Sequence, residues 1–326
     1  MQRAVSIATA LCLLAGFAQA DDKSWVEKSD EHAQLVLGAF AELAPEGAGS
    51  MGVDGLDENI TDLSPGFQDR ATETIERILA ELETRLVDET DLKVRQDLGI
   101  LIKSARDTLY TQELEDKYML PYMNVSQAIF GGLRGLIDPQ VSRDRYPAAV
   151  IRMEKYAGLA DGYEPLTELA KQMSMEKFGD DSLVGPYRDE VEQDLERAET
   201  FVTGIEELLA GTDLQGWEGT YETLAGQMRD YNDWVREEIL PRARDDFRLP
   251  AVMYQDALKN WGVEATPEAL IEQATKGYMD IRNEMEALAP LVAKKFGYET
   301  NDYREVIALL KKNGGIDGDK MLDHYH

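Results

Sequence analysis

Apolar side chains recur every three or four residues along most of this chain, and this spacing strongly limits the folds that it can adopt. One such series runs from Val191 to Leu209, and a second runs from Trp217 to Val235. Because an α-helix has about 3.6 residues per turn, each series places its apolar side chains on one face of a helix. The sequence at 211–216 between them is typical of a tight turn. We therefore expect two antiparallel helices that pack as a helical hairpin.

The same spacing predicts helices on both sides of this hairpin. The stripe from Leu270 to Leu288 follows Thr266, a suitable N-cap, and Pro267, which fits the first turn of a helix. No run of alternating apolar and polar residues is rich enough in β-branched side chains to predict a strand. The sequence thus predicts an all-α fold, an array of antiparallel amphipathic helices with few or no strands. The other expected helices cover 33–43, a segment from about 67 to 86, 92–109, 147–156 and 165 to about 178.

Loops are expected where turn-forming residues are concentrated. These segments are 45–64, 119–144 and 178–185. The chain contains no low-complexity linker and no repeat of fixed period, so we expect one continuous helical portion over 21–326. A soft domain boundary is expected near 179–186.

The first 20 residues have the layout of a cleaved secretory signal. Arg3 precedes an apolar run over 8–17, and small residues lead to a cleavage position after Ala20. The run is too short to span a bilayer as a mature helix, although a buried first helix is the alternative. We therefore expect a periplasmic or secreted protein with no membrane span in the mature chain. Cys12, the single cysteine, lies in this segment, so the mature chain has neither a disulfide nor a catalytic thiol.

The charge of the chain excludes one class of partner. Its formal net charge is −29, and loss of Arg3 with the signal makes the mature chain more negative still. Phosphate backbones are bound by clusters of lysine and arginine, so no nucleic acid partner is expected. The acidic residues alternate with basic ones along helices and are typical of solvated faces.

Motifs that carry chemistry are scarce. The segment 47–52 matches G-x-G-x-x-G, but it follows a helix and no strand-helix-strand unit accompanies it, so we interpret it as a flexible loop. Asp317 and Asp319 lack the further oxygen ligands of a calcium loop. No nucleophile elbow or P-loop is present.

The chain has three histidines, and none lies in a zinc-peptidase motif. His324 and His326 are two residues apart, a spacing that places them on different faces of a helix. His32 is predicted to lie on the surface of the first mature helix. The sequence therefore assigns no catalytic residue and no metal ligand, and any binding residue is unknown.

Three blocks in this chain resemble the domain of unknown function 885 family of bacterial exported proteins. Phe247–Pro250, Tyr254 and Gly262 are among the most characteristic residues of the third block. The blocks keep their family order and cover most of the mature chain. They comprise 42–57 with 61–65, then 122–138 with 146–158, and finally 240–288.

This resemblance implies a relation to helical zinc metallopeptidases that close a deep cleft around their metal. The implied chemistry needs two histidines one turn apart with a glutamate between them. The chain has no H-E-x-x-H, so the family's zinc ligands cannot be transferred to it, and zinc is implied only for a complete family member. We therefore expect the N-terminal portion of a peptidase-like domain that does not hydrolyse peptides on its own. A natural short form that lost its catalytic half is the competing account.

The alternative function is a non-catalytic periplasmic binding or interaction protein, with peptides or a small ligand as partners. Tyr122, Asn124, Arg248 and Tyr254 are the residues to inspect first. Arg248 could bind a substrate carboxylate through two hydrogen bonds. The competing interpretation is that Arg248 bonds a helix end while the tyrosines pack in the core. If the chain is one portion of a larger protein, some helices should expose apolar faces.

Overall fold

The computed structural model describes residues 25–314, and these residues are mainly α-helical with no β-sheet, as predicted. They divide into two compact units between Met253 and Tyr254, each described separately below. The signal segment with Cys12 and Ala20, the pair Asp317 and Asp319, and the histidines at 324 and 326 lie outside the described residues.

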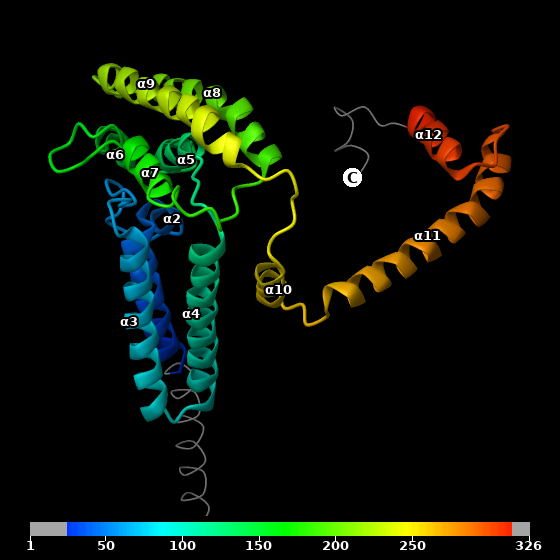
Figure 1. Cartoon of the computed structure of the whole chain (residues 1–326), viewed down its shortest axis with the longest axis horizontal. Helices are drawn as coiled ribbons and strands as arrows, with labels where there is room; N and C mark the ends of the chain where they lie inside the picture. The colour runs from blue at the N-terminus through cyan, green and yellow to red at the C-terminus, as the bar shows by residue number, and fades with distance from the viewer. Residues whose placement is uncertain (1–24, 315–326) are drawn as a thin grey trace, which may run out of the picture. The chain divides into compact units, whose positions relative to one another are not determined.

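Three long helices pack together in the first part of the chain (Figure 1). The first covers residues 25–43, and it is followed by α3 (Phe67–Asp88) and α4 (Leu92–Tyr118). Asp91 caps α4, because its side chain accepts hydrogen bonds from the backbone N–H groups of Lys93 and Val94. The helices share a small apolar core of Ala39, Ile78, Leu82, Val94, Leu98 and Ile102.

The main core of the first unit surrounds α5. This helix (Val125–Ile137) contacts α2 (Pro45–Ser50), α6 (Tyr146–Tyr156), α7 (Leu166–Met175), α8 (Arg188–Ala210) and α9 (Glu218–Trp234). The 3₁₀ turn η1 (Arg143–Arg145) precedes α6. The largest fully buried side chains of this core include Tyr156, Tyr231, Leu133, Leu136, Ile129, Ile205, Leu224 and Met153.

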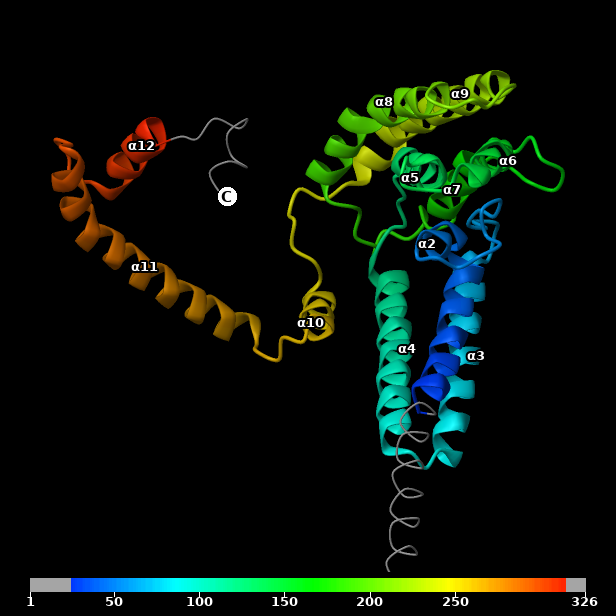
Figure 2. The ribbon, with the colours of Figure 1, turned by 180° about the vertical axis from the view of Figure 1, so that it is seen from behind.

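The predicted helical hairpin is confirmed, since α8 and α9 lie side by side in both views (Figures 1 and 2). The helix continues past α9 as a π-turn, η2 (Val235–Ile239), and a 3₁₀ turn, η3 (Leu240–Arg242). The segment 179–186, near which a soft boundary was expected, lies within the first unit. There Val184 exchanges backbone hydrogen bonds with 118–120, and Arg244 bonds Pro186.

Two of the predicted loops contain helices, so those predictions are partly wrong. The expected loop 45–64 includes α2, and the expected loop 119–144 includes α5. Within α5, only Gln127, Gly131 and Arg134 are exposed, and neighbouring helices cover the other residues wholly or in part. This polar face is too narrow to mark a surface helix clearly in a sequence. Its three glycines also resemble turn residues. The expected loop 178–185 has no helix, as predicted.

The second unit contains a long helix and a short one. Helix α10 (Ala251–Asn260) spans the division, and α11 (Pro267–Phe296) and α12 (Tyr303–Asn313) follow it. The predicted start of α11 is confirmed, because Thr266 Oγ1 accepts a hydrogen bond from Ala269 N at 3.3 Å. Helix α12 folds back beside the C-terminal end of α11 (Figure 2). This contact encloses a small core of Ala289, Ala293 and Val306.

Candidate binding pocket

The four residues singled out in the sequence occupy structural or exposed positions. Asn124 caps α5, with Oδ1 accepting a hydrogen bond from Gln127 N at 3.0 Å. Tyr122 is half-buried, and its hydroxyl donates to Asp194 Oδ2 at 3.1 Å. Burial, with the Asp194 carboxylate beside it, raises the pKa of Tyr122 well above its usual range. Both side chains therefore support the fold around the start of α5.

Arg248 and Tyr254 are exposed. Arg248 donates to Asp246 Oδ2 at 3.2 Å and lies near the Phe247 ring, so it does not make the helix-end contact considered above. Tyr254 belongs to the second unit and is 43 % exposed. Among residues 25–314, no hydrogen bond or ion pair joins Arg248 to either Tyr122 or Asn124.

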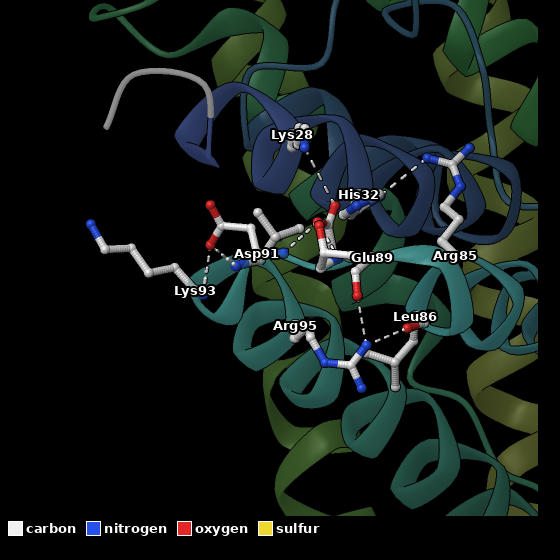
Figure 3. Close-up of polar contacts among 10 residues, drawn as sticks. Lys28, His32, Arg85, Leu86, Glu89, Asp91, Lys93 and Arg95 are labelled. Carbon is white, nitrogen blue, oxygen red and sulfur yellow. Dashed lines mark hydrogen bonds and ion pairs between the residues drawn. The ribbon is translucent and has the colours of Figure 1, made fainter. Parts of the chain in front are cut away.

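His32 is buried, with only 7 % of its surface exposed, so the prediction of a surface position is wrong. Figure 3 shows its contact with α3: the Nδ1 atom faces Arg85 Nη1 at 3.1 Å. Since arginine can only donate, Nδ1 accepts and the neutral ring carries its proton on Nε2. Burial and the Arg85 charge lower the pKa of His32, which Glu89 and Glu31 partly oppose.

A buried polar cluster lies where the first two sequence blocks meet. Glu46 in α2 accepts hydrogen bonds at Oε1 from the Tyr156 hydroxyl, 2.9 Å away, and from Thr61 N, 3.0 Å away. Its Oε2 accepts from Thr61 Oγ1 at 2.7 Å. Tyr156 is fully buried, and its burial raises its pKa well above the usual value, so the phenol stays protonated and donates to the carboxylate.

Gly132 in α5 makes this arrangement possible. A Cβ atom at position 132 would overlap the Tyr156 hydroxyl and lie 3.4 Å from Glu46 Cγ. Only glycine therefore allows α5 to approach α2 and α6 closely enough for the hydrogen bond between Tyr156 and Glu46.

Two arginines form hydrogen bonds with the loop between α2 and α3, beside the same cluster. Arg152 is buried and donates to the carbonyl oxygens of Gly132 at 2.7 Å and Leu56 at 2.9 Å. Arg145 forms a two-pronged ion pair with Asp57, with both distances below 3 Å. The hydrogen bond from Arg145 lowers the pKa of Asp57. Together these contacts hold the walls of the cluster in one arrangement.

A small open pocket adjoins this cluster. It has a volume of about 190 Å³. Glu46, Thr61 and Tyr156 supply its polar groups, and a backbone surface is supplied by Gly47. The remaining lining residues are apolar: Ala44, Met123, Ala128 and Leu166.

The polar residues of the pocket were not predicted from the sequence. These residues are Glu46, Thr61 and Tyr156. Each falls in or beside a family block, and that was the only available signal. Glu46 and Tyr156 are 110 residues apart, and only the packing of α2 on α5 and α6 brings them together. Segment 47–52 was interpreted as a flexible loop, but 47–50 belongs to α2 and Gly47 lines the pocket.

Side chains of the types that bind metal ions are dispersed in the described part of the chain. Within 25–314, no three side chains of histidine, cysteine, aspartate or glutamate are arranged to hold a metal ion. The single histidine in that range, His32, faces an arginine rather than other ligands. In the same range, every helix is too short or too polar to cross a bilayer.

Comparison with known proteins assigns the chain to a family. A family model described as "bacterial protein of unknown function" matches residues 45–326, which include every lining residue of the pocket except Ala44. No curated protein matches the chain. Because the matched region covers far more than half of its length, this chain belongs to the bacterial DUF885 family.

Proposed function

We propose that this chain is the helical, cleft-forming portion of an exported metallopeptidase-like protein and that it does not hydrolyse peptides on its own. The observation that carries the proposal is the uncovered apolar face of α11. The exposed side chains of its stripe include Ile281, Met285 and Leu288, and Ile271, Tyr278, Met279 and Leu291 are exposed elsewhere around the helix.

Among the described residues of its own unit, α11 packs on α12 near its C-terminal end, where Ala289 and Ala293 meet Val306. Most of a helix's stability in a protein comes from packing of its apolar face. Ile281 and Leu288, two residues of this stripe, are each 55 % exposed, a large fraction for side chains on a regular apolar stripe. Such a face is typical of a surface that another protein segment covers.

A catalytic portion is the partner that we propose for this face. Zinc held by such a portion would activate water and polarise the peptide carbonyl. The present chain would contribute helices to the wall of the cleft, since its sequence has no H-E-x-x-H motif. Export follows from the signal-like segment at 1–20, so the proposed location is periplasmic or secreted.

Reading the coding sequence beyond His326 tests this proposal most directly. We expect an in-frame H-E-x-x-H motif downstream, and a stop codon immediately after His326 in an intact gene would overturn the proposal. The present chain and the extended one should then be assayed with zinc and a mixture of peptides. Hydrolysis is expected only for the extended chain.

Cell fractionation tests the proposed location. The mature protein is expected outside the inner membrane with Asp21 as its first residue. An uncleaved chain in the cytoplasm would contradict export without affecting the fold.

A non-catalytic binding protein is the second candidate, and the pocket beside Glu46 favours it. This candidate predicts a cooperative fold for the present chain and a melting temperature that rises with a bound peptide or small ligand. A melting temperature that stays constant across a peptide panel would count against peptides as its ligands.

A further inference from the structure

The geometry points to a binding site for a primary ammonium group in the pocket beside Glu46. The ligand is either a small free amine or the N-terminal end of a peptide, since both present the same –NH₃⁺ group. This inference stands apart from the proposed peptidase relation, because it depends only on residues within the first unit.

The first argument is the charge of Glu46. Its three hydrogen-bond donors are the Tyr156 hydroxyl, the Thr61 hydroxyl and the Thr61 backbone N–H, and all three are neutral. No lysine or arginine of the described residues forms an ion pair with it. Arg152 lies nearby and keeps its charge, but its Nη atoms donate to the carbonyl oxygens of Gly132 and Leu56 and not to Glu46. A half-buried carboxylate of this kind is stabilised by a cation that enters the pocket.

The second argument is the remaining hydrogen-bonding capacity. A carboxylate accepts about four hydrogen bonds, two at each oxygen. Oε1 already accepts two, from Tyr156 and from Thr61 N, whereas Oε2 accepts one from Thr61 Oγ1. One acceptor position on Oε2 is therefore free for an N–H of the ligand, and the Tyr156 hydroxyl is already committed as a donor.

The third argument is the shape and polarity of the pocket. Apart from Glu46, Thr61 and Tyr156, its side-chain walls are apolar and suit a short aliphatic stem. Its volume of about 190 Å³ is below the roughly 300–1,000 Å³ that drug-sized ligands occupy. A small amine fits this space, and an anionic ligand is disfavoured by the Glu46 charge.

The site is also fixed before any ligand arrives. Glu46 is held by hydrogen bonds from two different segments, and Tyr156 of α6 is held against α5 by its full burial. A ligand would therefore spend little of its binding free energy on ordering these groups.

Titration of the full chain with three probes tests the inference. Propylammonium represents a free amine, alanyl-alaninamide represents a peptide N-terminus, and N-acetyl-alaninamide lacks the ammonium group. We expect saturable binding of at least one of the first two probes and none of the third, measured by calorimetry or by chemical-shift changes. Tighter binding of alanyl-alaninamide would identify the peptide source, and tighter binding of propylammonium the free amine.

Glu46→Gln provides the matched variant, because glutamine retains the shape and most of the hydrogen bonds but removes the charge. A loss of affinity of about tenfold or more is expected, in line with a charge-assisted hydrogen bond. Glu58→Gln is the control, since Glu58 is exposed and outside the pocket, and it should bind like the unmodified chain.

Three results would overturn the inference: no binding of either ammonium probe, equal binding of the acetylated probe, or unchanged affinity in Glu46→Gln. The comparison of acetylated and free probes uses the unmodified chain, so it remains decisive if the variant fails to fold. A failure here would leave the proposed peptidase relation intact, because that proposal depends on α11 and on the downstream sequence.

Discussion

Helices α5 and α11 show that the ease of predicting a helix is unrelated to how well it is packed. The 30-residue α11 has a regular apolar stripe, a threonine cap and a proline in its first turn, yet most of that stripe is exposed within its unit. The 13-residue α5 contains three glycines and was expected to be a loop, yet it lies at the centre of the main core. Local sequence pattern therefore governs helix formation in α11, whereas surrounding helices govern it in α5.

The largest effect on stability is expected from shortening a buried side chain of α5. Leu133 in α5 is completely buried, so Leu133→Ala should lower the free energy of unfolding by about 2–5 kcal/mol. Leu288→Ala on α11 removes the same atoms from a side chain that is 55 % exposed. This substitution should change the free energy of unfolding by about 0.5 kcal/mol or less. Urea unfolding of both variants measures the two changes in the free energy of unfolding. Equal decreases would contradict this prediction.

A second contrast lies within α5 itself. Gly132→Ala should destabilise the chain by about 1–3 kcal/mol, because the new Cβ overlaps the Tyr156 hydroxyl. Gly131→Ala is the matched control, since a Cβ there meets no atom within 4 Å and alanine favours helix by about 0.5–1 kcal/mol. Gly132→Ala is expected to lower the melting temperature, and Gly131→Ala is expected to raise it. Two variants that shift the melting temperature in the same direction would show that the close approach is unimportant.

Removing one hydroxyl tests the polar cluster that α5 helps to build. Tyr156→Phe leaves Glu46 with two donors and should cost about 1–2 kcal/mol in the free energy of unfolding. Tyr254→Phe, at an exposed position of the second unit, serves as the control and should have little effect. If the two variants unfold at the same denaturant concentration, the buried hydrogen bond contributes no net stability.

The three-helix part of the first unit should show a pH dependence through His32. Its pKa is lowered in the folded state, so the unfolded chain binds the proton more readily than the folded chain. This contribution to stability is present above the unfolded pKa of about 6.5 and is lost as pH falls through the lower folded value. Melting temperatures between pH 7.5 and 5 measure it. His32→Gln should flatten the curve in this range, and an unchanged slope would exclude His32 as its source.

The smallest effect on stability is expected on the exposed face of α11. Replacing Ile281 and Leu288 by serine should change the free energy of unfolding little, because both side chains are more than half exposed. The same variant should bind less of a fluorescent dye that recognises apolar surface. A large loss of stability would mean that this face is already buried in solution.

Much of the helical framework could be predicted from the sequence. The hairpin of α8 and α9 and the start of α11 were predicted because apolar spacing and caps act over one or two turns. The burial of His32 was not predicted, because the interpretation relied on its direct neighbours Glu31 and Ala33 rather than on residues one or two turns away. The side chain of His32 instead lies on the same helical face as Leu35, Val36 and Ala39.

The candidate pocket could not be predicted in the same way. Glu46 is one of 63 acidic residues, and nothing in its neighbourhood distinguishes it from a solvated carboxylate. Its hydrogen bonds come from Thr61, 15 residues away, and Tyr156, 110 residues away. Pairings over such distances depend on how α2, α5 and α6 pack, and that information is spread over many side chains.

By itself, the sequence determined that this chain is an acidic helical protein and placed most of its helices, because periodicity and capping are local properties. The resemblance carried by its three blocks agreed with the family found by comparison. Only the tertiary structure decided that α5 is central, that Glu46 meets Tyr156 across a glycine, and that α11 leaves its stripe exposed. These features depend on which helix faces pack together. An apolar pattern in the sequence predicts that a helix has a packing face, but it does not identify the helix that packs against it.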